Sequence, residues 1–282
     1  MMQVSTNTRL PVQREKIIVA AAHGCVRFRP DSPALKNSGD RLATMPNLDN
    51  PIVQWVRSFV RARGFDIVWY RPLTKVLAHH GINVVLDVGA NQGQFAIELR
   101  RQGYRDRLIS FEPQTDVFQL LQNRARGDAT WQTVNIGLGE KDGELEMNIF
   151  AVSDYGSMLQ PVATVDTPAL IERRRVPVRR LDSVWSEYCK PGDNVFLKLD
   201  VQGYEKMVVD GAAGCLDRIA GIQMEMSITP LYEAQLDWEE MLRFMRAKGF
   251  DLWKIEKGTW DPATGRESEL DGIFFRSKPL KK

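Results

Sequence analysis

A turn rich in glycine and polar residues, 87–93, has the residue types of a small-ligand site. It reads Asp-Val-Gly-Ala-Asn-Gln-Gly, follows an apolar run and precedes a segment with helical periodicity. Glycines allow a backbone to approach a ligand closely, and the first turn of a helix presents free N–H groups. The spacing of Gly89 and Gly93 is not that of dinucleotide sites, and no phosphate-binding loop sequence occurs. Because Asp87 precedes the turn, the sequence favours a cationic ligand over a pyrophosphate.

S-adenosylmethionine is such a ligand, since it carries an ammonium and a sulfonium group. An acid suited to its ribose is Glu112, which follows a second apolar run 25 residues beyond Asp87. In nucleotide-binding folds an acid about 20 residues after the glycine turn contacts the ribose hydroxyls, and a carboxylate accepts two hydroxyls at once. The structural alternatives are a tight turn without a ligand and an acid that complements a helix dipole. The candidate cofactor residues are Asp87, Gly89, Asn91, Gly93, Glu112 and, at the end of a third apolar run, Asn135.

Two further apolar runs end in carboxylates. Asp200 follows one run, and Glu225 lies near the end of the next. Polar residues at the carboxyl ends of parallel strands face the crevice in which open α/β sheets bind ligands. Glu205 opens the helix-type segment after Asp200, where an acid also suits a helix N-terminus. Lys198 is expected to pair with a nearby acid, because lysine is rarely buried without a partner.

The elements that must position these residues alternate between strand and helix. We expect strands at 84–88, 108–111, 131–135, 195–199 and 221–226. We expect helices at 94–102, 115–125, 204–210 and 237–248. Continuous apolar strands separated by helices indicate a parallel sheet with helices on both faces. Segments 250–255 and 272–276 are expected to add an antiparallel edge, so the sequence predicts a doubly wound α/β fold.

The N-terminal part differs from this pattern. Its first 50 residues have scattered Pro, Ser, Asn and Gly and no periodicity apart from one short element near 17–22. Apolar residues at helical spacing follow Pro51. Residues 1–64 hold 10 basic and 4 acidic side chains, so the basic excess is local. The expected parts are an irregular basic arm over 1–50, a helical appendage over 51–83 and a main domain over 84–282 with an insertion at about 140–190.

Composition excludes several classes of protein. The chain of 282 residues is 43% hydrophobic and 26% charged, as soluble globular proteins are. A net charge of +2 argues against a generic nucleic-acid-binding protein. Three cysteines without a paired spacing predict neither a disulfide framework nor a zinc ribbon, and they favour a cytoplasmic location. No apolar run approaches the ~20 residues that span a bilayer.

Five motifs occur in order along the chain and form a recognisable set. They are Asp-Val-Gly-Ala-Asn-Gln-Gly, Phe-Glu-Pro, Val-Asn, Arg-Leu-Asp and Lys-Leu-Asp-Val-Gln-Gly-Tyr-Glu, which begin at residues 87, 111, 134, 180 and 198. Together they closely resemble the FkbM family of S-adenosylmethionine-dependent methyltransferases. The resemblance implies a Rossmann-like class I methyltransferase fold, with a mostly parallel seven-stranded sheet. Gln202 stands where the family more often has Glu, so any role of an acid there is lost or passes to Asp200 or Glu205.

The resemblance also implies methyl transfer to a hydroxyl, on a sugar, a glycolipid or a natural-product scaffold. A hydroxyl must lose its proton during the transfer, which usually requires a general base. The three histidines all precede residue 84, so the usual histidine base is missing unless the N-terminal arm folds over the site. The catalytic candidates are therefore Asp200 first, then Glu225 and Glu205. No metal is predicted, because two acids alone are insufficient grounds for one.

The acceptor itself is not specified by the sequence. Segments 153–159 and 173–180 are candidates for a lid over it, and the arginines of the second segment also suit a solvated face. With the basic N-terminal segment, they predict an acceptor on an anionic lipid or peripheral contact with an anionic membrane surface. Three alternatives stay open: N-methylation of a small molecule, a catalytically silent binding module of the same fold and, disfavoured by the glycine spacing, a nucleotide-binding oxidoreductase.

Overall fold

The structure is a computed structural model, which describes residues 17–19, 25–28, 51–62, 66–68, 72–151, 156–162, 169–261 and 263–277. Contacts among residues divide the chain into two compact units, Met1–Pro72 and Leu73–Lys282. Within the described ranges, no helix is both long and apolar enough to cross a bilayer.

In its described residues, the first unit combines a small sheet with a helix. Its strands are ordered β1-β2-β3, namely β1 (Ile17–Val19), β2 (Cys25–Phe28) and β3 (Asp66–Val68). Helix α1 (Pro51–Arg61) begins at a proline, whose fixed φ suits the first helical position. Strand β1 coincides with the element expected near 17–22, whereas β2 and β3 were not expected. Most of the predicted N-terminal arm lies outside the described residues.

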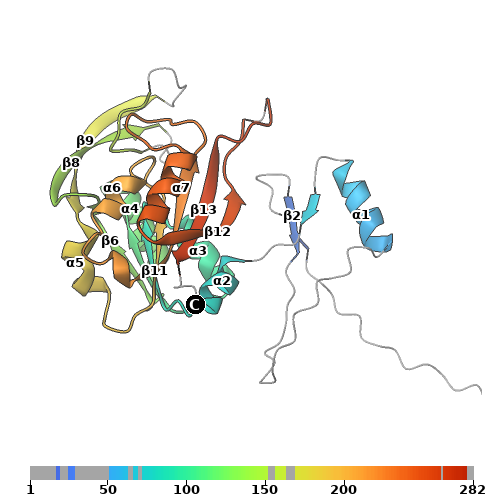
Figure 1. The fold of residues 1–282 in the computed structure, drawn as a ribbon, viewed down its shortest axis with the longest axis horizontal. Coiled ribbons are helices and arrows are strands. Elements are labelled where there is room, and N and C mark those ends of the chain that lie inside the picture. The colour runs from blue at the N-terminus through green and yellow to red at the C-terminus, as the bar shows by residue number, and fades with distance from the viewer. Residues whose placement is uncertain are drawn as a thin grey trace, which may run out of the picture. The chain divides into compact units, whose positions relative to one another are not determined.

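A seven-stranded sheet forms the centre of the second unit (Figure 1). Its order is β12-β13-β11-β10-β4-β5-β6. The strands are β4 (Val84–Val88), β5 (Arg107–Phe111), β6 (Trp131–Val134), β10 (Val195–Leu199), β11 (Ile219–Ser227), β12 (Phe250–Lys257) and β13 (Glu269–Arg276). All neighbouring pairs are parallel except those of β13, which runs antiparallel to both β11 and β12. This confirms the predicted α/β fold with a mostly parallel sheet and an antiparallel edge.

The helices of this unit are α2 (Leu73–His79), α3 (Gln94–Arg101), α4 (Thr115–Ala125), α5 (Leu181–Tyr188), α6 (Glu205–Asp210) and α7 (Trp238–Ala247). Alternate residues of the central strand β4 enter two cores, as the period of a strand requires. Val84, Leu86 and Val88 pack with residues of α5, α6 and α7 on one face, and Val85 packs with residues of α2, α3 and α4 on the other.

Helix α2 belongs to the second unit, although the sequence analysis placed it in an appendage that ended at residue 83. The compact unit begins at Leu73. Leu73 and Leu77 are buried in the same core as Val85 of the central strand. The contacts of α2 with the sheet therefore place the division of the chain 11 residues before the expected start at 84.

The insertion between β6 and β10 contains its own small sheet, ordered β7-β9-β8. It consists of β7 (Gly137–Leu138), β8 (Gly143–Phe150) and β9 (Leu170–Arg179). Residues 173–179 of the basic segment expected in a lid belong to β9. Val176 and Val178 are buried against Met147 and Ile149 of β8, and Pro177 between the two valines is exposed. Strands β8 and β9 curve along one side of this unit (Figure 1).

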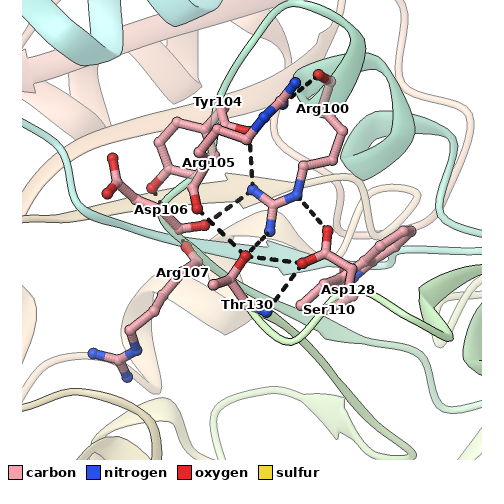
Figure 2. A network of polar contacts seen from close by, with 9 residues as sticks. Arg100, Tyr104, Arg105, Asp106, Arg107, Ser110, Asp128 and Thr130 are labelled. Carbon is pink, nitrogen blue, oxygen red and sulfur yellow. Dashed lines mark hydrogen bonds and ion pairs between the residues drawn. The ribbon is translucent and has the colours of Figure 1, made fainter.

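An arginine of α3 holds the loops that lead into β5 and β6 (Figure 2). Arg100 Nε lies 2.7 Å from Asp128 Oδ2. Its Nη1 donates to the carbonyl of Asp106 and its Nη2 to the hydroxyl of Thr130, both at 2.9 Å. Asp128 also accepts from the Thr130 hydroxyl at 2.8 Å. The network fixes the starts of both strands against the helix that follows the glycine turn.

Candidate active site

A cavity of about 680 Å³ lies at the carboxyl ends of β4, β5, β10 and β11. This is the sheet edge at which the polar strand ends were expected to meet, and the volume is within the ~300–1,000 Å³ of small-molecule sites. All of its lining residues belong to the second unit. Of the predicted site residues, Gly89, Asn91, Glu112, Asp200 and Glu225 line the cavity, whereas Asp87, Gly93, Asn135 and Glu205 do not.

Gly89 brings the turn after β4 against the end of β10. Its φ is +72°, and a Cβ at this position would lie 1.9 Å from the carbonyl oxygen of Asp200. Only glycine permits so close an approach of the two segments. The predicted ligand turn is therefore packed directly on the segment that carries the first catalytic candidate.

Glu112 connects the turn after β4 with the loop after β5. Its Oε2 accepts from the backbone N–H of Asn91 at 2.9 Å, and its Oε1 accepts from that of Gln114 at 2.8 Å. Burial raises the pKa of Glu112 to about 7, although the two backbone hydrogen bonds lower it. A carboxylate has about four acceptor positions, so capacity remains for two ligand hydroxyls. The remaining acceptor positions of Glu112 thus fit the two hydroxyls of a ribose diol.

Two other predicted cofactor residues support this region from outside the cavity. A Cβ on Gly93 would lie 2.9 Å from the side chains of Leu121 and Trp131, so this glycine permits close packing at the start of α3. Asn135 Nδ2 donates to the carbonyl of Glu112 at 2.8 Å. The amide therefore holds the loop after β5 in place.

A buried lysine links Asp87 to Asp200. Lys198 Nζ lies 3.4 Å from Asp87 Oδ1 and 3.1 Å from Asp200 Oδ2, which confirms the expected pairing with an acid. Burial lowers the pKa of Lys198, but the charges of Asp200 and Asp87 outweigh burial and raise it. Burial raises the pKa of Asp87, against the opposing charge of Lys198 and a hydrogen bond from the Ser110 hydroxyl. The ammonium of Lys198 therefore pairs with both the buried Asp87 and Asp200 at the cavity.

Carboxyl groups gather around Asp200. Glu225 of β11 and both Glu269 and Asp271 of β13 line the same cavity. Burial raises the pKa of Glu225 to about 10, and the neighbouring Asp200 and Glu269 add to the shift. Burial also raises the pKa of Glu269, and it raises that of Asp271 to about 6. Glu225 is therefore protonated at neutral pH, whereas Asp200 forms an ion pair with Lys198.

Glu269 and Asp271 were not among the predicted site residues. The last strand was expected to begin at residue 272, whereas β13 begins at Glu269. Their spacing could have identified them, because two acids that lie two residues apart in a strand face the same side of the sheet. In the described part of the chain, no group of three His, Cys, Asp or Glu side chains is arranged to hold a metal ion.

Gln202 joins two carboxyl groups at the cavity. Its φ is +53°, and its Nε2 donates to Asp200 Oδ1 at 3.1 Å and to Glu225 Oε2 at 3.2 Å. An ionised glutamate has no donor for these two carboxyl groups and would place a second negative charge beside Asp200. The amide at this position therefore suits the carboxyl groups that surround it.

Glu205 closes the loop after β10. Its Oε1 accepts from the backbone N–H groups of Val201 at 3.1 Å and Gly203 at 3.3 Å. Burial raises its pKa from 4.5 to about 7, although the backbone hydrogen bonds lower it. A carboxyl with a raised pKa contributes stability that is complete below the unfolded-state pKa and lost as the pH rises through the folded-state pKa.

Glu205→Gln is therefore expected to remove a pH-dependent loss of stability. The glutamine retains one oxygen for the two backbone donors but cannot ionise. Between about pH 5 and pH 8 the stability difference should shift in favour of the variant by about 1–3 kcal/mol. Thermal denaturation at several pH values measures this difference. Glu239→Gln, at an exposed carboxylate of α7, should show no such shift, and a pH-independent difference for Glu205→Gln would contradict the prediction.

The fold and the cavity together define a class of enzyme. A sheet of this order, with a glycine turn after β4, an acid after β5 and a cavity above both, is that of a Rossmann-like S-adenosylmethionine-dependent methyltransferase. The family model of the methyltransferase FkbM domain matches residues 87–252, more than half of the chain. The protein belongs to the FkbM methyltransferase family, and its cofactor is S-adenosylmethionine. A comparison with curated proteins finds no match.

Several solved structures match this chain at low sequence identity and low TM-score. The magnesium protoporphyrin IX methyltransferase ChlM from Synechocystis PCC 6803, with bound SAM, is 10% identical over 85% of this chain and 87% of that chain, with a TM-score of 0.41. An rRNA methylase from Streptococcus thermophilus is 9% identical over 75% of this chain and 99% of that chain, with a TM-score of 0.41. A putative tRNA (m1A22) methyltransferase from Streptococcus pneumoniae, Sp1610, is 10% identical over 74% and 71%, with a TM-score of 0.41.

Proposed function

We propose that the protein transfers a methyl group from S-adenosylmethionine to a hydroxyl of a sugar, glycolipid or natural-product acceptor, with Asp200 as the general base. The position of Asp200 carries this proposal. Its carboxylate lies at the cavity, 3.1 Å from Lys198 Nζ, and its side chain is 44% exposed. It is thus both held by a cation and accessible to an acceptor.

The residues around Asp200 fit this chemistry. When bound, the cofactor would supply an electrophilic methyl group for the acceptor oxygen and a sulfur as the leaving group. Asp200 would take the proton that the acceptor hydroxyl loses. Lys198 and Gln202 hold the two carboxylate oxygens of Asp200 in place. Met147 and Met158 of the insertion add apolar surface to the cavity, and the exclusion of water strengthens its electrostatic interactions.

A screen of acceptors tests this assignment. The purified protein is incubated with methyl-labelled S-adenosylmethionine and with glycosides, glycolipids and hydroxylated natural products, each beside an amine of similar shape. Methylation of the hydroxyl compounds is expected. Methylation of the amines alone would replace the proposal with N-methylation, for which the carboxyl groups of the cavity offer attraction to an ammonium. Binding of S-adenosylhomocysteine without turnover on any acceptor would favour a silent binding module.

The arginines of the insertion add little free positive charge for the predicted contact with an anionic membrane. Arg174 pairs with Glu172 and lies 2.8 Å from Asp116, and Arg173 lies 3.7 Å from Glu146. Acids of the same unit thus compensate much of the positive charge of β9. The basic N-terminal segment lies largely outside the described residues, so the membrane contact and the cytoplasmic location stay predictions.

A further inference from the structure

The β11–β13 ladder presents polar side chains to the cavity from both of its strands. Gln223 and Glu225 lie two residues apart on β11, and Glu269 and Asp271 lie two residues apart on β13, and all four line the cavity. Residues two apart share a face of a strand. Glu225 and Asp271 are direct partners in the antiparallel register. A continuous polar wall therefore stands beside Asp200.

Gln223 has an acceptor that the protein does not use. Its side chain is 8% exposed and hydrogen-bonds to Asp271, but its Oε1 is buried and has no hydrogen-bond partner. A buried acceptor without a partner is costly, and such groups in native structures call for an explanation. A donor from a bound molecule in the cavity would satisfy this oxygen.

The wall offers donors and acceptors side by side. Burial raises the pKa of Glu225 to about 10, and Glu225 and Glu269 hydrogen-bond to each other, so this pair of carboxyl groups shares a proton. Asp271 is subject to the charges of both Asp200 and Lys198. A hydroxyl both donates and accepts, whereas an ammonium only donates and an ionised acid or phosphate only accepts. Neutral hydroxyl groups match this mixture of partners.

We propose that Gln223, Glu269 and Asp271 form an acceptor subsite that binds an uncharged polyhydroxylated ring through hydroxyls adjacent to the one that is methylated. This β11–β13 subsite rests on the proposed function, since it assigns the part of the acceptor that does not react. Asp200 contacts the reacting hydroxyl, and the subsite fixes the ring beside it. Orientation of the bound hydroxyl at reacting distance then contributes to the rate.

Ligand-detected NMR on the full chain tests the subsite without turnover. With S-adenosylhomocysteine bound, saturation transfer is measured to methyl α-D-mannopyranoside, which carries adjacent neutral hydroxyls, to glucosamine as the cation and to glucuronate as the anion. The neutral glycoside is expected to bind at millimolar concentration. Glu269→Gln and Asp271→Asn are each expected to weaken its binding by roughly tenfold or more, the effect of losing one hydrogen bond to a charged group.

Two controls separate the subsite from general damage to the fold. Glu239→Gln removes an exposed carboxylate on α7 and should leave glycoside binding unchanged. Gln223→Leu changes the subsite residue that is not acidic, and it should also weaken binding of the glycoside. Calorimetric titration with S-adenosylhomocysteine should give the wild-type affinity for every variant, because none of the three subsite residues is a predicted cofactor contact.

The outcomes distinguish this inference from the proposed function. The subsite is wrong if no neutral glycoside binds, if glucosamine or glucuronate binds more tightly, or if the variants bind the glycoside as the wild type does. If hydroxyls are methylated while the variants leave KM unchanged, the subsite fails and the proposed function stands. If the glycoside binds and the subsite variants weaken its binding, but no hydroxyl is ever methylated, the proposed function fails and the subsite stands.

Discussion

Asp200→Asn is expected to lower kcat by about 10²–10⁴-fold, the range that follows from loss of a general base. The asparagine oxygen can still accept from Lys198, whose Nζ lies 3.1 Å from the carboxylate. The amide cannot take the proton of an acceptor hydroxyl, so the chemical step slows while the site keeps its shape. Rapid-quench measurement of single-turnover rates, with an acceptor from the screen, gives the size of the loss. Affinity for S-adenosylhomocysteine should change little.

Glu225→Gln is the matched comparison for this variant. Because Glu225 is protonated at neutral pH, its amide replacement exchanges one neutral hydrogen-bonding group for another. Its effect on kcat should therefore stay within about tenfold. Near-normal turnover of Asp200→Asn, together with a larger loss in Glu225→Gln, would assign the proton transfer to Glu225 instead.

The second large effect is expected from Gly89→Ala, which should abolish stable folding or lower the free energy of unfolding by about 4 kcal/mol or more. The added Cβ would lie 1.9 Å from the carbonyl oxygen of Asp200 and 2.8 Å from its carbonyl carbon. Neither atom belongs to a flexible side chain, so β4 and β10 would have to separate at the ends that form the cavity. Soluble yield and urea denaturation measure the effect.

Gly103→Ala separates this steric conflict from backbone strain. Gly103 also has a positive φ, +98°, but a Cβ there would meet nothing within 4 Å. Only the strain of a left-handed alanine remains, at about 1–2 kcal/mol. Equal losses of stability in the two variants would mean that the approach of Gly89 to Asp200 does not contribute.

Much of the fold follows from local sequence pattern. Strands β4 and β10 and helix α4 have the expected bounds, because continuous apolar runs and helical spacing are strong signals. Strand β9 was not expected, since its inward residues Val176 and Val178 are separated and preceded by exposed charges. Helix α5 was also missed, although it is as long as α3, which was expected. Tertiary packing buries the apolar residues of both missed elements.

The rule that polar strand ends meet at one edge located Asp200 and Glu225 correctly at the cavity. The rule did not identify Glu269 and Asp271, because they lie at the start of β13, which runs antiparallel to β11. The rule also cannot separate a residue that faces a ligand from one that supports the loop beneath it. Asp87, Asn135 and Glu205 do not line the cavity, and each contacts a neighbouring strand end or loop.

The position of β13 inside the sheet has a consequence for synthesis of the chain. This strand lies between β11 and β12, although it follows both in the sequence. Until residues 269–276 have left the ribosome, β11 presents an unpaired backbone edge and β12 has no partner in the sheet. Such edges attract other chains, and large domains expose them while folding is incomplete. The nascent protein therefore exposes unpaired strand edges until Glu269 and Asp271 reach the cavity, so protection of these edges and completion of the polar wall occur together.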